Sequence, residues 1–111
     1  MLSHQYRLPA TTKLTHPGFI RTSLFNVKYA SNGLTVSRFG FVIKKSADKR
    51  AVIRNRIRRV FRSCIEESLE EIKPGFDMLF FLEKGIMGVT RDALLVEIKK
   101  MLERNSIITK V

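Results

Sequence analysis

The sequence predicts an α+β fold in which two helices pack on one face of a small β-sheet. Residues 23–30 and 34–45 alternate apolar and polar side chains with the period of two that is typical of strands. Residues 76–83 form a third, largely apolar strand, and residues 48–72 and 90–104 carry apolar side chains at helical spacing. The expected order is therefore β-β-α-β-α, arranged as a two-layer sandwich.

The chain has 111 residues, which suits a single domain with one modest core. We expect residues 1–111 to form this one domain, with residues 1–22 as an irregular N-terminal arm that has room for one short helical turn. Pro9, Pro17 and Gly18 interrupt any longer helical pattern in the arm.

The first two strands are expected to form an antiparallel hairpin through the Asn-Gly turn at residues 32–33. Each strand gathers its aromatic and branched side chains on one face. These core-facing side chains are Phe25, Val27, Tyr29, Phe39, Phe41 and Ile43. The opposite faces carry Asn26, Lys28, Arg38, Gly40, Val42 and Lys44. We expect the aromatic rings to pack in the core rather than to stack on nucleic-acid bases.

Local signals set the expected limits of the helices and of the third strand. Asp48 is a suitable N-cap for the first helix, because its carboxylate accepts hydrogen bonds and complements the helix dipole. That helix should end before Pro74, and Thr90 should cap the last helix. The apolar stretch at residues 78–82 indicates a strand that is covered on both faces or central in the sheet.

The chain is strongly basic, and its charge is unevenly distributed. There are 21 Lys and Arg against 10 Asp and Glu, which gives a net charge of +11. Residues 1–65 hold 14 basic residues and one acid, whereas residues 66–111 have a net charge of −2. Such an excess is relieved by a polyanion, for which nucleic acid is the first candidate and an anionic membrane the second.

The positive charge is densest at residues 49–62, where seven of fourteen positions are basic and six of these are Arg. A guanidinium group grips phosphate through two hydrogen bonds and stacks on bases. Like charges four residues apart destabilise an isolated helix, so this composition favours an RNA-binding surface over an ordinary solvated face. The side expected to pack on the sheet carries Ile53, Ile57, Val60, Phe61 and Cys64. The predicted RNA-binding residues are Lys44, Lys45, Lys49, Arg50, Arg54, Asn55, Arg56, Arg58, Arg59 and Arg62.

No protein active site or metal site is predicted. His4 and His16 lie in the arm without neighbouring ligands, and Cys64 should be a buried, inert thiol. Asp77 and Glu83 bracket the third strand and pair with nothing evident. Because the sequence has neither a signal peptide nor an apolar stretch that could span a bilayer, we expect a cytoplasmic location.

The stretch from Arg38 to Lys45 and the basic run from Lys49 to Arg59 closely resemble the bacterial ribonuclease P protein component. The core Arg54-Asn55-Arg56, extended by Arg58, Arg59 and Arg62, looks like the signature helix of that family. Pro74-Gly75-Phe76-Asp77 ahead of a strand is also similar. The resemblance covers about residues 23–104.

The resemblance implies the small protein subunit of a ribonucleoprotein that removes the 5′ leader from precursor tRNA by endonucleolytic cleavage. The catalytic RNA subunit would hold the active site and its Mg²⁺ ions. The protein would bind that RNA and the leader, would supply no catalytic residue and no cofactor of its own, would be monomeric by itself and would contact no membrane. The family fold also implies a left-handed β-α-β crossover, against the general rule.

In the family the leader lies in a cleft on the sheet face opposite the core. Here that face would present Asn26, Lys28, Val42 and Lys44. Relatives also line the cleft with aromatic residues of an N-terminal helix. This segment is shortened here, carries Pro17-Gly18 and offers Phe19 as the equivalent aromatic residue. The predicted leader-cleft residues are therefore Phe19, Asn26, Lys28 and Val42.

The residues leave two other functional classes open. One is a stand-alone basic RNA- or DNA-binding module, such as a ribosomal protein. The other is a peripheral membrane protein with a basic amphipathic helix, which the absence of Trp and the continuity of the apolar helix side with the core disfavour.

Overall fold

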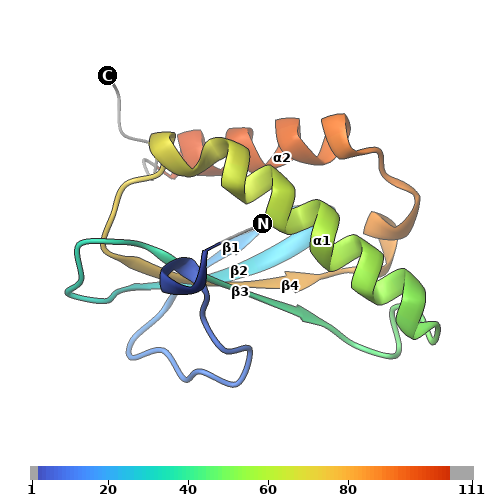
Figure 1. The fold of residues 1–111 in the computed structure, drawn as a ribbon, viewed down its shortest axis with the longest axis horizontal. Coiled ribbons are helices and arrows are strands. Elements are labelled where there is room, and N and C mark those ends of the chain that lie inside the picture. Colours follow the sequence, from blue (N-terminus) through green and yellow to red (C-terminus); the bar gives the residue numbers. More distant parts are fainter. Residues whose placement is uncertain (1–2, 106–111) are drawn as a thin grey trace.

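The computed structural model describes residues 3–105, in which two α-helices lie over one face of a four-stranded sheet (Figure 1). The strands and α-helices are β1 Gly18–Arg21, β2 Phe25–Ser31, β3 Arg38–Ile43, α1 Ala51–Ser68, β4 Phe76–Leu82 and α2 Arg91–Arg104. Short 3-10 helices are η1 His4–Tyr6, η2 Leu69–Glu71 and η3 Lys84–Gly88. The predicted α+β sandwich is confirmed. Within the described residues, neither α-helix is long and apolar enough to cross a membrane.

The predicted hairpin between β2 and β3 is wrong. The strand order is β1-β2-β4-β3, so β4 lies between them, antiparallel to β2 and parallel to β3. The segment after β2 bends at Gly33, where φ is +69°, and the chain does turn back, but it first passes the start of β4, so β3 runs along the other edge of β4 and not beside β2. The Asn32 N–H donates to the Gly75 carbonyl at 2.8 Å, which ties this segment to the chain just before β4. The apolar β4 strand thereby gains a neighbour on each edge, and its predicted central position is confirmed.

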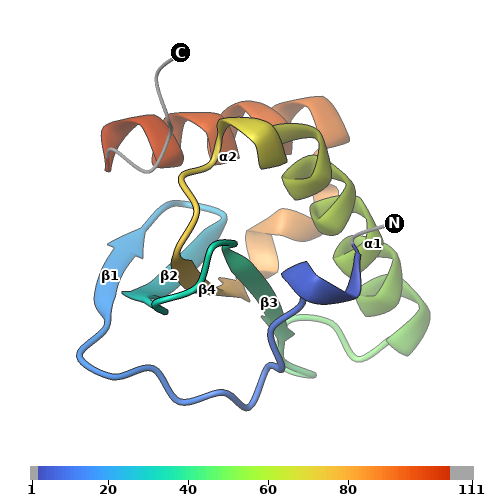
Figure 2. The same cartoon turned by 60° about the vertical axis from the view of Figure 1, so that its left-hand side comes forward.

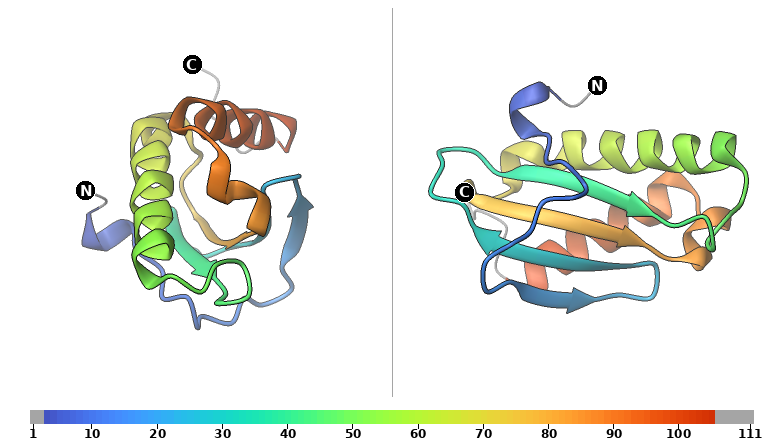
Figure 3. Two further views of the ribbon diagram at one scale, coloured as in Figure 1. Left: turned by 90° about the vertical axis from the view of Figure 1, so that its right-hand side faces the viewer. Right: turned by 90° about the horizontal axis from the view of Figure 1, so that it is seen from below.

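The connection from β3 through α1 to β4 is a left-handed crossover. β3 and β4 are adjacent and parallel, and α1 lies on the far side of the sheet when the uncovered face is viewed (Figure 3, right). With both strands turned to point upward in that view, β4 lies to the right of β3 and the helix lies behind them. A right-handed crossover would place β4 to the left, so the handedness implied by the family resemblance is confirmed.

An aromatic cluster joins α1 to the sheet. The ring of Phe61 on α1 lies 5.3 Å from Phe25, 5.3 Å from Phe41 and 4.9 Å from Phe80, measured between ring centroids. All four side chains are buried, and burial of each large apolar side chain contributes about 1.5–3 kcal/mol. This cluster fixes how α1 is rotated about its own axis, in agreement with the helical spacing of its apolar residues. The side of α1 opposite the cluster therefore faces solvent.

The N-terminal arm contains a strand that the sequence analysis did not predict. β1 pairs antiparallel with β2, although residues 1–22 were expected to be irregular apart from one turn. Four residues after Pro17 are too few to show a clear alternation. Close packing holds this strand in place, because a Cβ atom on Gly18 would lie only 2.5 Å from the ring of Tyr29. The expected helical turn is present as η1.

Between η1 and β1 the arm crosses the uncovered face of the sheet, from the β3 edge to the β1 edge (Figure 2). The Leu8 N–H donates to the Phe39 carbonyl at 2.9 Å, and Leu8 is buried. A Cβ atom on Gly40 would lie 2.6 Å from the Leu8 carbonyl oxygen. The arm is therefore seated on the sheet at this point.

The first helix starts later than predicted. α1 begins at Ala51 with Arg50 as its N-cap, and Arg50 makes no side-chain capping bond. Asp48 instead accepts a hydrogen bond from the Arg50 N–H at 2.9 Å. Its carboxylate therefore stabilises the turn that precedes α1 and is not the N-cap of the helix. The predicted cap of α2 is confirmed, because Thr90 Oγ1 accepts from the Ala93 N–H at 3.2 Å.

Candidate RNA interface

A groove of about 950 Å³ runs between α1, the start of β3 and the N-terminal arm. We call it the arm groove. Its helix wall consists of Val52, Asn55, Arg58, Arg59 and Arg62, and its arm wall includes His4, Arg7 and Leu8. Four of the ten predicted RNA-binding residues therefore lie together in one concave surface. His4 and Arg7 were not among the predicted residues, because the arm shows no periodic pattern from which its position could be inferred.

The guanidinium groups of the helix wall are held in defined positions. Arg58 Nη1 donates to Asn55 Oδ1 at 2.9 Å, and the guanidinium of Arg62 lies 5.7 Å from the ring centroid of Phe41, a cation–π contact. Partial burial, together with the charges of Arg54 and Arg62, lowers the pKa of Arg58. Arg58 stays charged at neutral pH, so its lowered pKa reflects first the loss of hydration on partial burial and second the repulsion from Arg54 and Arg62.

Some of the basic residues around the start of α1 form contacts within the protein itself. Arg50 forms an ion pair with Asp48 at 2.9 Å, and side-chain and backbone hydrogen bonds from Arg50 lower the pKa of Asp48 to about 2. Arg54 Nη1 donates to the Asp48 carbonyl oxygen at 2.8 Å. Lys45, Lys49 and Arg56 are exposed and line neither the arm groove nor the cleft described next.

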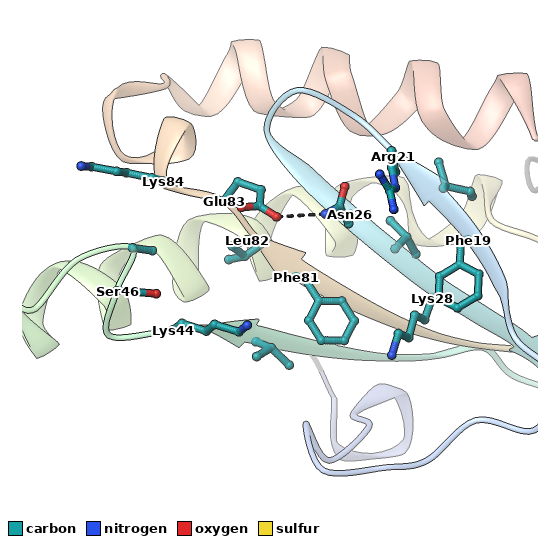
Figure 4. Close-up of a pocket in the computed structure, with 14 residues that line it drawn as sticks. Phe19, Arg21, Asn26, Lys28, Lys44, Ser46, Phe81, Leu82, Glu83 and Lys84 are labelled. Carbon is teal, nitrogen blue, oxygen red and sulfur yellow. Dashed lines mark hydrogen bonds between the residues drawn. The ribbon is translucent and has the colours of Figure 1, made fainter.

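A second hollow, of about 440 Å³, lies on the uncovered face of the sheet (Figure 4). We call it the sheet cleft. It brings together all four predicted leader-cleft residues and Lys44; these are Phe19, Asn26, Lys28, Val42 and Lys44. The structure adds Phe81, Arg21 and Lys84 to its lining. Phe81 escaped prediction because the unbroken apolar run of β4 hides which residues face outward, and Arg21 lies on the strand that was not predicted.

Aromatic and cationic groups alternate across the sheet cleft. The ammonium of Lys28 lies 5.7 Å from the ring centroid of Phe19 and 5.3 Å from that of Phe81 (Figure 4). Phe19 is 67% exposed, an unusual state for a large apolar side chain. The cleft therefore offers both ring faces and positive charge to a ligand.

The two acidic residues at the ends of β4 do have partners, contrary to the prediction. Asn26 Nδ2 donates to Glu83 Oε1 at 2.9 Å inside the sheet cleft. Asp77 is buried and receives two hydrogen bonds from Arg38, at 2.8 and 2.6 Å, and one from Asn32. Burial alone would raise the pKa of Asp77, but these hydrogen bonds and the Arg38 charge hold it below its ordinary value.

Cys64 and the side chains that could bind a metal are the remaining candidates for reactive groups among residues 3–105. Cys64 is buried, and burial raises the pKa of its thiol, which makes the nucleophilic thiolate scarcer, as expected of an inert thiol. Among residues 3–105, no three His, Cys, Asp or Glu side chains group closely enough to hold a metal ion. The two basic surfaces therefore remain the features to explain.

Comparison with known proteins identifies the family. A family model described as Ribonuclease P matches residues 13–106, which is most of the chain. The chain belongs to the ribonuclease P family. Curated relatives named "Ribonuclease P protein component" include those of Microcystis aeruginosa, 38% identical over 72 residues, and Synechocystis, 32% identical over 72 residues. Each match covers 65% of this chain but only 60% and 58% of those relatives, so the chain spans about three fifths of their length.

Solved structures of the ribonuclease P family have the same fold. The RNase P protein from Thermotoga maritima, solved in complex with 1-(4-fluorophenyl)-2-thiourea, superposes with a TM-score of 0.74 at 25% identity. The alignment covers 80% of this chain and 86% of that protein. The Staphylococcus aureus RNase P protein gives a TM-score of 0.74 at 18% identity over 84% of each chain, which shows a shared fold. The family match contains α1 and the sheet cleft but begins after His4 and Arg7.

Proposed function

We propose that this chain is the protein subunit of ribonuclease P. It binds the catalytic RNA through the exposed Arg and Asn side chains of α1, and it holds the 5′ leader of precursor tRNA in the sheet cleft. The observation that carries the proposal is the pairing of these two surfaces on one ribonuclease P fold. One is a helix with Asn55, Arg58, Arg59 and Arg62 gathered along a groove, and the other is a cleft of aromatic rings and ammonium groups.

The chemistry of the sheet cleft suits a single-stranded RNA such as a leader. The rings of Phe19 and Phe81 can stack on bases of any sequence, and Lys28 and Lys44 can contact the phosphates between them. Bases of a duplex are already stacked on one another and would not reach these rings. An unpaired segment is therefore the better occupant.

The proposal assigns the chemistry to the RNA subunit and binding to the protein. The RNA holds the Mg²⁺ ions and cleaves the phosphodiester bond. The protein lowers the Mg²⁺ requirement, because its basic side chains offset phosphate charge that free cations would otherwise have to screen. The protein is a monomer by itself, works in the cytoplasm and contacts no membrane.

The test is leader cleavage by the matching catalytic RNA at low Mg²⁺, with and without the protein. We expect the protein to stimulate cleavage and to bind this RNA more tightly than an arbitrary RNA of equal length. Equal affinity for both RNAs without stimulation would contradict the proposal and favour a stand-alone RNA- or DNA-binding module.

A matched pair of variants tests the α1 surface. Arg59 is exposed and makes no contact that the fold needs, so Arg59→Ala should weaken binding of the catalytic RNA by about tenfold. It should also reduce the slope of log affinity against log salt by about 0.9 for the lost phosphate contact. Lys100→Ala removes the same charge from the exposed surface of α2 and should leave the slope unchanged. Equal slopes for the two variants would remove Arg59 from the interface.

A further inference from the structure

A further hollow, of about 290 Å³, lies between the turn that joins β1 to β2 and the C-terminal half of α2. We call it the edge hollow, because β1 is an edge strand of the sheet and its end lies beneath this part of α2 (Figure 3, left). The polar residues of its lining are Arg21, Thr22, Ser23, Glu97, Lys100 and Arg104. The edge hollow is separate from the arm groove, with which it shares no lining residue.

Positive charge predominates in the edge hollow. Arg21, Lys100 and Arg104 are exposed, and Glu97 is the acid that lines the hollow with them. Within residues 3–105, no ion pair joins any of these three cations to a carboxylate. A cation in the last turn of a helix offsets the helix dipole, which accounts for Arg104. It does not account for Arg21, which comes from another element and lines the same hollow. Cations contributed by two elements favour an anionic occupant.

The edge hollow adjoins the sheet cleft at Arg21, which lines both (Figure 4). The cleft extends across the sheet from Lys44, just after β3, to Phe19 and Arg21 on β1. α1, the surface proposed to bind the catalytic RNA, follows Lys44 closely in the chain. Because that RNA cleaves the leader, nucleotides next to the cleavage site belong at the β3 side of the cleft. Nucleotides farther from the cleavage site then lie at the β1 side, next to the edge hollow.

We propose that the leader continues past Arg21 into the edge hollow, where Arg21 and Arg104 bind phosphates of the nucleotides farther from the cleavage site. The proposal rests on the proposed function for the identity of the RNA. The guanidinium groups can each grip a phosphate through two hydrogen bonds, and Lys100 adds to the positive charge around them.

The lining of the edge hollow suits the backbone of the RNA rather than its bases. Cations and the Ser23 hydroxyl line it, whereas no aromatic side chain of the described residues does. Contacts to phosphates position a nucleic acid without reading its sequence. Binding in the edge hollow should therefore depend on the length of the leader and not on its sequence. A short leader ends within the sheet cleft and gains nothing from it.

The test compares precursor tRNAs with short and long leaders, bound to the complex of the protein with the matching catalytic RNA. Small domains engage about 4–16 nucleotides of a single strand, so leaders of about 3 and about 15 nucleotides bracket the range. Arg104→Gln is the test variant. Lys99→Gln is the control, because it removes the same charge from α2 at a position that does not line the edge hollow.

We expect Arg104→Gln to bind the long leader about twofold to fivefold more weakly than Lys99→Gln does, as for other exposed charge pairs. The slope of log affinity against log salt should fall by about 0.7 for the lost contact with a single strand. The two variants should bind the short leader equally. Their affinities for the catalytic RNA alone should also be equal, because the edge hollow lies outside the α1 surface.

A second variant changes the charge of the edge hollow in the opposite sense. Glu97→Gln removes the acid from the lining and should strengthen binding of the long leader by about twofold, with no effect on the short leader. A gain in affinity of this kind cannot result from partial unfolding of the variant.

A crosslinking measurement tests the contact directly. A photo-crosslinker attached to Ser23→Cys should label the long leader at nucleotides far from the cleavage site. One attached to Ala93→Cys, on an exposed part of α2 that does not line the hollow, should not label the leader. Cys64 is buried and should not compete for the reagent.

The outcomes separate this inference from the proposed function. Equal affinity of Arg104→Gln and Lys99→Gln for the long leader, with no crosslink from position 23, overturns the edge hollow as a leader site. Stimulated cleavage of the short-leader substrate by the wild type would then still support the proposed function. A crosslink from position 23 to the catalytic RNA overturns the assignment to the leader. A wild-type protein that stimulates cleavage of neither substrate overturns both proposals.

Discussion

The carboxylate of Asp77 is bound from two sides on the uncovered face of the sheet. Arg38 and Asp77 lie opposite each other in the register of β3 and β4, which places two guanidinium nitrogens on the two carboxylate oxygens. The sequence does not reveal Arg38 as the partner of Asp77, because the two residues are 39 positions apart and meet only when their strands are parallel neighbours. A contact of this kind depends on topology, and no local pattern predicts it.

Replacing Asp77 tests this contact through the pH dependence of stability. Because the folded-state pKa of Asp77 is lowered, its contribution is complete above the unfolded pKa of about 3.9 and is lost as the pH falls further. Asp77→Asn should therefore lower the free energy of unfolding by about 2 kcal/mol at pH 7, and the difference from the wild type should shrink below about pH 4. Urea unfolding at a series of pH values measures both effects. Glu103→Gln, which removes an exposed carboxylate on α2, is the control, and a pH-independent difference for Asp77→Asn would contradict the prediction.

At the scale of elements, the contact between the arm and β3 depends on a residue without a side chain. The Leu8 carbonyl approaches the position where Gly40 would carry a Cβ atom, and Leu79 crowds the same position. Any larger residue at position 40 must move either the arm or the central strand. The arm, anchored by few bonds, should move first.

Gly40→Ala should therefore release the arm from the sheet. We expect a loss of about 1–3 kcal/mol in stability from overpacking and faster hydrogen exchange of the Leu8 amide, whose bond to Phe39 would break. Gly88→Ala is the control, because no atom lies within 4 Å of the added Cβ atom there. Unchanged protection of the Leu8 amide in Gly40→Ala would show that the arm does not depend on this close approach.

Elements with a clear period were predicted well. The faces of β2 and β3 and the buried side of α1 follow from their spacing, because periodicity reports directly which side chains are buried. β1 was missed because four residues carry too little pattern, and the hairpin was predicted wrongly because an Asn-Gly turn does not reveal that a strand from later in the chain inserts beside it. The left-handed sense of the β3-α1-β4 crossover was predicted from the family resemblance alone.

Residues of the candidate site were predicted where the helix or strand that carries them was predicted. Charge density alone identified the arginines of α1. The alternation of β2 and β3 placed Asn26, Lys28 and Val42 on the face opposite the core, and the family resemblance identified that face as a cleft. His4 and Arg7 were missed because an irregular arm has no period from which its position over the sheet could be inferred.

For the molecule as a whole, the two basic surfaces should act independently. The arm groove and the sheet cleft share no lining residue and use different residues of β3 and its C-terminal end, Phe39, Gly40 and Phe41 for the groove and Val42 and Lys44 for the cleft. Each can therefore be altered while the other keeps its geometry, and their free-energy effects should add.

Phe19→Ala and Arg59→Ala test this independence. Phe19→Ala removes a stacking surface and should weaken leader binding by about tenfold or more without changing affinity for the catalytic RNA. Arg59→Ala should do the reverse. In the double variant both losses should appear, each within about 0.5 kcal/mol of its value in the single variant. A double variant whose loss greatly exceeds the sum would indicate one coupled surface.

The position of β4 at the centre of the sheet also has a consequence for how the protein is made. β2 and β3 each pair with β4 and not with each other, although both precede it in the chain. Until β4 leaves the exit tunnel of the ribosome, β3 has no strand partner. α1 precedes β4 in the chain and emerges first, with its arginines exposed to the surrounding ribosomal RNA. Because pairings between distant segments form slowly, the sheet closes only once the chain through Leu82 is free of the exit tunnel. Premature termination before that residue would leave a basic helix attached to unpaired strand edges, a fragment prone to aggregate with nucleic acid rather than to fold.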